Sequence, residues 1–139
     1  MHEGSITIRL PANLCEIEEL NRLVRQFGEL HGIPSRTLYA MNLALDEIFT
    51  NVVLHGFADA TGQEIVVRLE TLAQELQSEV VDGGREFDPR SAPLPDLTAA
   101  LSERTVGGLG IHLVRSLMDG VDYRREKAKN VLTMRKRIR

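Results

Sequence analysis

The sequence has few aromatic residues and almost no cysteine. Its 139 residues include no tryptophan, two tyrosines, four phenylalanines and one cysteine, Cys15. So few rings argue against base stacking as the main way of binding single-stranded nucleic acid. One cysteine excludes an internal disulfide and a zinc site built from several thiolates. The net charge of −3 also argues against a direct nucleic-acid partner, since such proteins usually carry a basic surface.

Long apolar runs and a leader sequence are missing as well. No stretch approaches the ~20 apolar residues of a membrane-spanning helix, and the first residues, Met1-His2-Glu3-Gly4, lack the basic and apolar parts of a signal peptide. No internal repeat, linker or low-complexity tract divides the chain. We therefore expect one cytoplasmic domain over residues 1–139, long enough to bury a core and without a membrane contact.

Periodicity predicts five strands and three helices. Alternating apolar residues indicate strands over 5–10, 64–70, 76–81, 121–125 and 131–138, with a turn over 126–130. Helical spacing predicts helices over 14–30, with an Asn13/Glu16 capping box, over 37–56, with Ser35 as N-cap, and between Gly107 and Gly120. This order indicates an α/β (α+β) two-layer sandwich, with helices on one face of a mostly antiparallel, mixed sheet.

The helix over 37–56 carries two polar residues beside a broad apolar stripe. Glu47 and Asn51 are one turn apart, so both side chains project from one face. They either lie at the margin of the buried stripe and touch water, or line a polar pocket above the core. The helix alone favours the first reading, and the second depends on the rest of the chain.

Two glycine-rich turns are further candidates for parts of a ligand-binding site. Asp82 ends a predicted strand and precedes Gly83-Gly84, a pattern typical of a turn but also of a carboxylate that binds an exocyclic amine beside close backbone. Gly107-Gly108-Leu109-Gly110 opens a helix, where exposed N–H groups bind anions, although a flexible loop would look the same. It is neither a Walker A loop nor a dinucleotide-binding fingerprint, because the Gly-Lys-Ser/Thr and the third glycine are missing.

These motifs, taken in order, resemble those of one superfamily. Glu47-x-x-x-Asn51, Asp82-x-Gly84 with Phe87-Asp88-Pro89, and Gly107-Gly108-Leu109-Gly110 resemble the GHKL ATPases, which include gyrase, mismatch-repair ATPases and histidine kinases. The surrounding residues are closer to one branch, the anti-sigma factor serine kinases of the RsbW/SpoIIAB type. The likeness spans nearly the whole chain and is strongest over 43–119. It implies the Bergerat ATP-binding fold, with residues 89–106 as a mobile ATP lid.

The resemblance also implies residue roles. Asn51 would coordinate Mg²⁺, and Glu47, one turn earlier, would be the general base. Asp82 would bind the adenine amine, with Gly84 behind the base and Thr133, on the last strand, near it. The phosphates of ATP would lie against Gly107, Gly108, Leu109 and Gly110.

Four other features point less clearly to a role. Glu86 stands where the superfamily often has a second glycine, which leaves ATP binding expected but the conformation of the lid open. Arg104 is a candidate phosphate contact, although a solvated arginine is the simpler reading. His55 and His112 are expected to be surface or satisfied histidines. The basic stretch 124–139 reads as a solvated edge, with a contact for an acidic partner as the alternative.

Two functions follow from the resemblance. In the first, the protein transfers the γ-phosphoryl group of Mg·ATP to a serine or threonine of a small anti-anti-sigma (STAS) partner and so regulates transcription. In the second, it is a nucleotide-dependent binding module that sequesters a sigma factor or another regulator. The catalytic module of a histidine kinase fits less well, because no helical segment with a phosphoacceptor histidine precedes the fold. The family resemblance also allows a homodimer.

Overall fold

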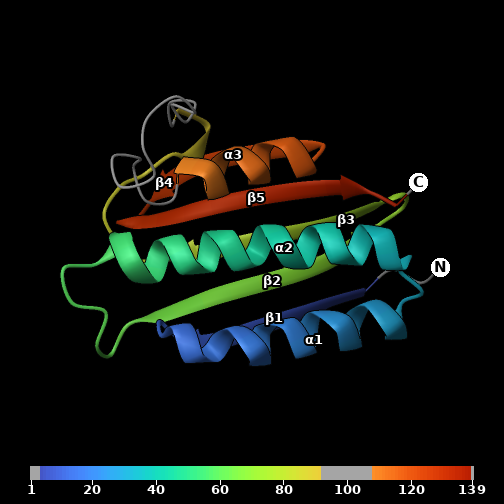
Figure 1. The fold of residues 1–139 in the computed structure, drawn as a ribbon, viewed down its shortest axis with the longest axis horizontal. Coiled ribbons are helices and arrows are strands. Elements are labelled where there is room, and N and C mark those ends of the chain that lie inside the picture. The colour runs from blue at the N-terminus through green and yellow to red at the C-terminus, as the bar shows by residue number, and fades with distance from the viewer. Residues whose placement is uncertain (1–3, 92–107, 139) are drawn as a thin grey trace.

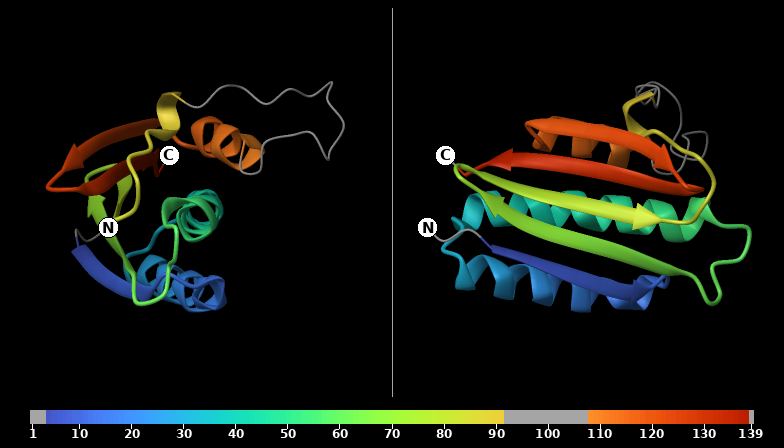
Figure 2. Two further views of the ribbon diagram at one scale, coloured as in Figure 1. Left: turned by 90° about the vertical axis from the view of Figure 1, so that its left-hand side faces the viewer. Right: turned by 180° about the vertical axis from the view of Figure 1, so that it is seen from behind.

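The computed structural model describes residues 4–91 and 108–138 and shows one five-stranded sheet with helices packed on one face (Figure 1, Figure 2). The strands are β1 (Gly4–Pro11), β2 (Glu64–Leu72), β3 (Glu75–Asp82), β4 (Gly120–Glu126) and β5 (Lys129–Arg137). The helices are α1 (Ile17–Leu30), α2 (Ser35–Asn51) and α3 (Gly108–Leu117), with short helical turns η1 (Leu14–Glu16), η2 (Val52–Gly56) and η3 (Pro89–Ser91). The predicted two-layer sandwich is confirmed.

The sheet is joined by two tight hairpins and runs in the order β1-β2-β3-β5-β4. All four neighbouring pairs are antiparallel. Ala73 closes the first hairpin with a φ of 49°, and Lys127 and Ala128 close the second with φ values of 52° and 63°. Residues with a side chain seldom adopt this left-handed region, which two-residue hairpin turns require. The predicted turn over 126–130 is therefore too long, and Asn130 is a strand residue.

One face of the sheet packs against the helices and forms the core. Along β3 the buried residues alternate and end at Asp82, so this carboxylate points toward the helix layer. Asn130 of β5 lies directly opposite Asp82 in the register and shares its face. The helices contribute large buried side chains to this core, among them Leu20, Val24, Met41, Leu45 and Phe49. Two polar residues thus stand at the edge of an apolar interior.

The start of α1 follows part of its predicted capping pattern. The Asn13 side chain accepts a hydrogen bond from the Cys15 N–H at 3.0 Å and so opens η1, which runs directly into α1. The reciprocal half of the predicted capping box is absent among the described contacts, because the Asn13 N–H donates to the Pro11 carbonyl at 2.8 Å instead of to Glu16. None of the described helices is long and apolar enough to cross a membrane.

The central helix α2 differs from its prediction at both ends. It begins at Ser35, with Pro34 before it, so Ser35 is the first helical residue and not the N-cap. Proline has no backbone N–H. It suits the entry to a helix because an N–H there would have no partner within the helix. At the other end, regular α-helix stops at Asn51 and continues as the π-helical turn η2. Such turns are rare and are often found beside functional sites.

Candidate active site

One end of the molecule brings the predicted motifs together. The C-terminal end of α2 with η2, the segment after β3 and the N-terminal end of α3 all lie there (Figure 1, Figure 2). Three residues on or just after the strands, which we call the strand end of the site, are Asp82, Gly84 and Asn130. Three residues on the helices, which we call the helix end, are Glu47, Asn51 and Gly110.

Asp82 has one engaged and one unengaged carboxylate oxygen. The side chain is only 5% exposed. Its Oδ1 accepts hydrogen bonds from the Gly84 N–H at 2.9 Å and from Asn130 Nδ2 at 3.0 Å. Its Oδ2 has no hydrogen-bond partner among the described residues. The turn-forming role and a binding role are therefore compatible, because the turn uses only one oxygen.

Gly84 lies where a side chain would strike rigid backbone. A Cβ at this position would fall 2.6 Å from the Gly56 carbonyl oxygen and 3.0 Å from its carbon. The same carbonyl accepts the Arg85 N–H at 2.8 Å, so the segment after β3 is tied to the end of η2. Arg125 reaches across from β4 and donates from Nη1 to the Gly84 carbonyl at 2.8 Å. Only glycine allows this close approach of two chain segments.

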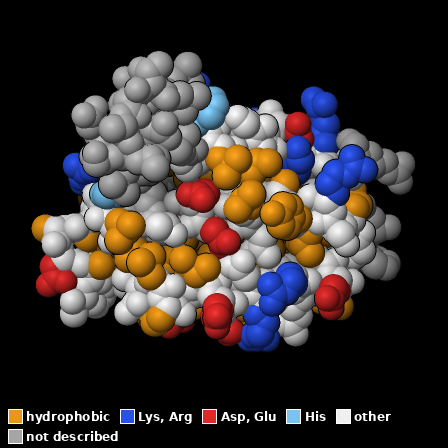
Figure 3. All heavy atoms as spheres, viewed as in Figure 1, with side chains coloured by type: hydrophobic (Ala, Val, Ile, Leu, Met, Phe, Trp, Pro, Cys, Tyr) orange, Lys and Arg blue, Asp and Glu red, His pale blue; other side chains and the backbone are white. Residues whose placement is uncertain are grey.

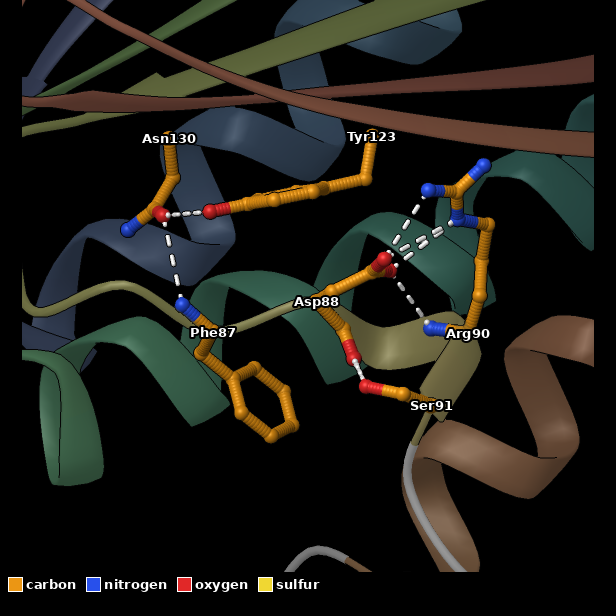
Figure 4. Close-up of polar contacts among 6 residues, drawn as sticks. All are labelled: Phe87, Asp88, Arg90, Ser91, Tyr123 and Asn130. Atoms are coloured by element: carbon orange, nitrogen blue, oxygen red, sulfur yellow. Dashed lines mark hydrogen bonds and ion pairs between the residues drawn. The ribbon is translucent and has the colours of Figure 1, made fainter.

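Asn130 is a polar residue of the site that the sequence analysis missed. Its carboxamide lies between β3, the segment after it and β4, and Figure 4 shows it between Tyr123 and the Phe87 backbone. The predicted turn over 126–130 placed this asparagine in a solvated loop, where it needed no partner. The hairpin carries no Asn-Gly or Asp-Gly pair that would have revealed its two-residue turn.

Thr133 lies away from the site residues it was predicted to join. It stands opposite Glu79 on β3 and Asp122 on β4, three residues along β5 from Asn130. Three residues of a strand span about 10 Å. An odd number of steps also turns the side chain to the opposite face of the sheet, away from Asp82. Thr133, which was predicted to lie near adenine, therefore does not share the face of the sheet on which Asp82 lies.

At the helix end of the site, two polar side chains of α2 lie close to a glycine of α3. Glu47 and Asn51 are both partly buried, and neither side chain has a hydrogen-bond partner within the ranges 4–91 and 108–138. A Cβ on Gly110 of α3 would overlap the Glu47 carboxylate. This missing side chain lets α3 approach the carboxylate closely.

An open hollow lies between α2 and α3. Its volume is about 300 Å³, and its lining residues are Glu47, Gly110, His112, Leu113 and Ser116. On the helix face of the molecule, acidic side chains lie between groups of apolar ones (Figure 3). His112 is exposed, as predicted. His55 is partly buried in η2, and its Nε2 lacks a partner within the described structure, so the prediction of a satisfied histidine is not met there.

Asp46, next to Glu47, is a second acidic group that the sequence analysis did not single out. Its Oδ1 accepts a hydrogen bond at 2.7 Å from Asn21 Nδ2 of α1. Partial burial, helped by the negative charge of Glu47, raises the pKa of Asp46 to about 6. Consecutive helical residues point in different directions, so Asp46 faces α1 while Glu47 faces α3.

The described segment after β3 ends in a compact turn. The Asp88 carboxylate accepts from the Arg90 backbone N–H and pairs with its guanidinium, and the Asp88 carbonyl accepts from the Ser91 hydroxyl (Figure 4). The hydrogen bonds from Arg90 lower the pKa of Asp88. Gly107, Arg104 and most of the predicted lid lie outside the described residues, and of Gly108 and Leu109 only their place at the start of α3 is described.

The donor set fits a magnesium–nucleotide complex better than a metal held by protein alone. The described residues contain no group of three or more His, Cys, Asp or Glu side chains that could hold an ion. Asn51 offers one amide oxygen, with Glu47 one turn away. Mg²⁺ commonly takes one or two oxygen ligands from the protein and the rest from phosphates and water. The residues present therefore fit this ion if a triphosphate supplies the other ligands.

Comparisons with known proteins agree with this geometry. The family described as the histidine kinase-like ATPase domain matches residues 10–136. The serine-protein kinase RsbW of Listeria monocytogenes is 32% identical over 131 residues, covering 87% of this chain and 79% of its own. The serine/threonine-protein kinase BtrW of Bordetella bronchiseptica is 30% identical over 100 residues, covering 72% and 70%.

A solved structure shows the same fold. It contains the RsbU and RsbW domains of Rv1364c from Mycobacterium tuberculosis and superposes with a TM-score of 0.66 at 16% identity. The match covers 96% of this chain but only 32% of that longer one. At this identity the likeness supports the arrangement of strands and helices and not the chemistry.

Proposed function

The chain belongs to the family of histidine kinase-like ATPase domains, and we propose that its substrate is a serine or threonine of a small anti-anti-sigma (STAS) partner, to which it transfers the γ-phosphoryl group of ATP. Relatives about 30% identical over most of the chain are serine/threonine-protein kinases, and the protein is accordingly a protein kinase of this type. One domain over residues 1–139, with residues 89–106 as its lid, would carry the activity.

The observation that carries the proposal is the unequal use of the two Asp82 oxygens. Oδ1 is held by two N–H groups, whereas Oδ2 has no partner in the described ranges although the residue is 5% exposed. A carboxylate oxygen that no protein donor occupies can accept a hydrogen bond from a ligand N–H. The 6-amino group of adenine is such a donor. Gly84, whose missing side chain lets the segment after β3 pack against Gly56, would lie behind the adenine ring.

The other site residues would act on the phosphates and on the incoming hydroxyl. Asn51 would hold Mg²⁺, which neutralises charge on the phosphates when bound. Glu47 would take the proton from the serine or threonine hydroxyl as the hydroxyl oxygen attacks the γ-phosphorus. The bond between that phosphorus and the β–γ bridging oxygen would break, and ADP would leave. Gly107, Gly108, Leu109 and Gly110 would present backbone N–H groups to the phosphates at the start of α3. Gly110 would also leave room for the Glu47 carboxylate.

A second function is nucleotide-dependent binding of a regulator, such as a sigma factor, without significant transfer. Both functions require a surface that contacts a protein partner, and apolar side chains available for such a contact include Tyr39 of α2, 70% exposed, and Leu54 of η2, 49% exposed. A homodimer is compatible with both functions. Neither function requires direct contact with nucleic acid or a membrane.

Phosphate transfer separates the two functions. The purified protein is incubated with radiolabelled ATP and STAS proteins encoded near its gene, and label on the STAS protein is counted. Glu47→Gln should lower transfer at least 100-fold while ATP affinity, measured by calorimetry, changes less than threefold, because the amide keeps its size but cannot accept the proton. Glu29→Gln, an exposed acid on α1, is the matched control and should transfer normally.

Two results would each count against one part of this proposal. If no STAS protein is labelled although ATP binds, the proposed phosphate transfer is wrong and nucleotide-dependent binding of a regulator is the favoured function. If Glu47→Gln transfers at the normal rate, Glu47 is not the base.

A further inference from the structure

The carboxamide of Asn130 is the most connected polar group at the strand end of the site. It is 6% exposed. Its Nδ2 donates to Asp82 Oδ1 at 3.0 Å and to the Arg85 carbonyl at 2.8 Å. Its Oδ1 accepts from the Tyr123 hydroxyl at 2.6 Å, from Arg125 Nη1 at 3.1 Å and from the Phe87 N–H at 3.3 Å (Figure 4). Both N–H groups and the oxygen are therefore fully used.

These five contacts allow only one orientation of the amide. If it turned over, its oxygen would face Asp82 Oδ1 and the Arg85 carbonyl, two acceptors. Its NH₂ would face three donors, from Tyr123, Arg125 and Phe87. Four of these five contacts would become repulsive, and only the Tyr123 hydroxyl, which can also accept a hydrogen bond, could adapt. A donor from Asn130 therefore always faces Asp82.

This fixed donor determines how Asp82 meets a ligand. Oδ1 is held from two directions, by Asn130 and by the Gly84 N–H, so the plane of the carboxylate is fixed and Oδ2 is the oxygen left over. A carboxylate oxygen without a protein donor can accept a hydrogen bond from the amino group of a 6-amino purine. The carbonyl oxygen of a 6-oxo purine would repel it. We propose that Asn130 is the positioning residue that orients the Asp82 carboxylate and thereby sets the preference for adenine over 6-oxo purines. This inference rests on the proposed function.

A merely structural role for Asn130 makes a different prediction. The same amide holds the Arg85 carbonyl and the Phe87 N–H, so it also shapes the segment that follows β3. If that were its whole contribution, its loss would weaken all purine nucleotides alike. If it orients Asp82, its loss weakens ATP more than inosine triphosphate, because only ATP donates to Oδ2. The ratio of the two dissociation constants separates these roles.

The first test measures that ratio by calorimetry with Mg·ATP and Mg·ITP. Wild-type protein should prefer ATP. Asn130→Ala should bind ATP at least tenfold more weakly, and the preference over ITP should fall at least tenfold. Gln77→Ala removes a carboxamide from the outer face of β3 and should change neither value. An unchanged ATP/ITP ratio in folded Asn130→Ala would overturn the proposal.

The second test keeps the size of the side chain and changes its protonation. In Asn130→Asp two carboxyl groups face each other at hydrogen-bond distance, with Arg125 and Tyr123 of β4 as the charged and titratable groups on the other side. Two facing carboxyl groups hold a shared proton at low pH and lose it as the pH rises. ATP should therefore bind at least tenfold more weakly than to wild type at the alkaline end of the profile, and affinity should recover at least fivefold toward the acidic end, where the shared proton restores a donor to Asp82. Parallel pH profiles for variant and wild type would refute the positioning role.

Failure of this inference can be told apart from failure of the proposed function. If the wild-type protein does not bind ATP, both the proposed function and the role of Asn130 are refuted. Wild-type protein that binds and prefers ATP, combined with Asn130 variants that keep the same preference, would remove only the role of Asn130.

Discussion

The two ends of the site differ in how far their side chains are already engaged. At the strand end, Asp82 and Asn130 are 5% and 6% exposed and are joined to each other and to the segment after β3. At the helix end, Glu47 and Asn51 are partly exposed and have no hydrogen bonds to described residues. A preformed pocket binds its ligand with little loss of freedom. Under the proposed function, recognition of the base would be built into the fold, whereas the catalytic arrangement would be completed by nucleotide and metal.

The largest effect is expected at the strand end, from Asp82→Asn. The amide oxygen of the new residue can still accept from Gly84 and Asn130, which leaves its NH₂ facing the adenine amine. Two hydrogen-bond donors then oppose each other. We expect ATP affinity to fall at least 100-fold, or about 3 kcal/mol, with the fold intact by circular dichroism. Calorimetric titration with Mg·ATP measures the loss.

Asp59→Asn is the control for this substitution. Asp59 lies in the loop between η2 and β2, and among residues 4–91 and 108–138 its carboxylate is bound only by Thr61. The control should bind ATP normally. Unchanged affinity in Asp82→Asn would show that the strand end does not bind the base.

A second test of the difference between the two ends of the site replaces one glycine at each end by alanine. The first substitution is Gly84→Ala. Here the new Cβ meets the Gly56 backbone at 2.6 Å, and backbone cannot move aside cheaply. Overpacking of this kind costs about 1–3 kcal/mol. We expect a drop of that size in the free energy of unfolding, measured with urea, together with weaker ATP binding. The neighbouring Gly83→Ala meets nothing within 4 Å and should be neutral.

The sequence predicted those parts of the molecule that depend on neighbours along the chain. Alternation located the strands, and the one-turn spacing of Glu47 and Asn51 placed them on one helix. Asp82-Gly83-Gly84 indicated the turn after β3. Each of these patterns lies within one element, so local periodicity and turn chemistry are enough to find it.

The parts that could not be predicted depend on register and on tertiary contacts. Asn130 reaches Asp82 only because Lys127 and Ala128 close their hairpin in two residues, both with left-handed backbone. The same register turns Thr133 to the other face. The π-helical turn η2 has no sequence signature that distinguishes it from an ordinary helix end. The contact of Asp46 with Asn21 likewise requires knowing how α1 packs on α2.

Gly110→Ala tests the helix end. We expect it to change the free energy of unfolding less than Gly84→Ala does, and in the opposite direction. Its Cβ would overlap the Glu47 carboxylate, which is the end of a flexible side chain and can move away. Alanine also favours a helix over glycine by up to ~1 kcal/mol. We expect stability to be unchanged or slightly higher, and phosphate transfer to fall about tenfold because Glu47 is displaced. A fall in stability as large as that of Gly84→Ala would contradict the proposed difference between the ends.

The smallest effect is expected from Asp46→Asn, which tests the charge next to the helix end. The pKa of Asp46 is raised from an ordinary value near 4 to about 6, so the folded protein binds this proton more tightly than the unfolded chain. Its stabilising effect is therefore complete below pH 4 and is lost as the pH rises through 6. Two pKa units correspond to about 2.7 kcal/mol, and solvent screening of this half-buried group reduces the expected change to about 1 kcal/mol.

Asparagine at position 46 keeps an oxygen for Asn21 Nδ2 and removes the charge. The variant should exceed wild type by about 1 kcal/mol in urea unfolding at pH 7.5 and match it at pH 4. Because Glu47 contributes to the raised pKa of Asp46, the gain should shrink in a Glu47→Gln background. Glu18→Gln, an exposed acid on α1, should show no such pH-dependent gain. An Asp46→Asn gain that is equal at both pH values would show that packing, and not this charge, limits the stability of the helix end.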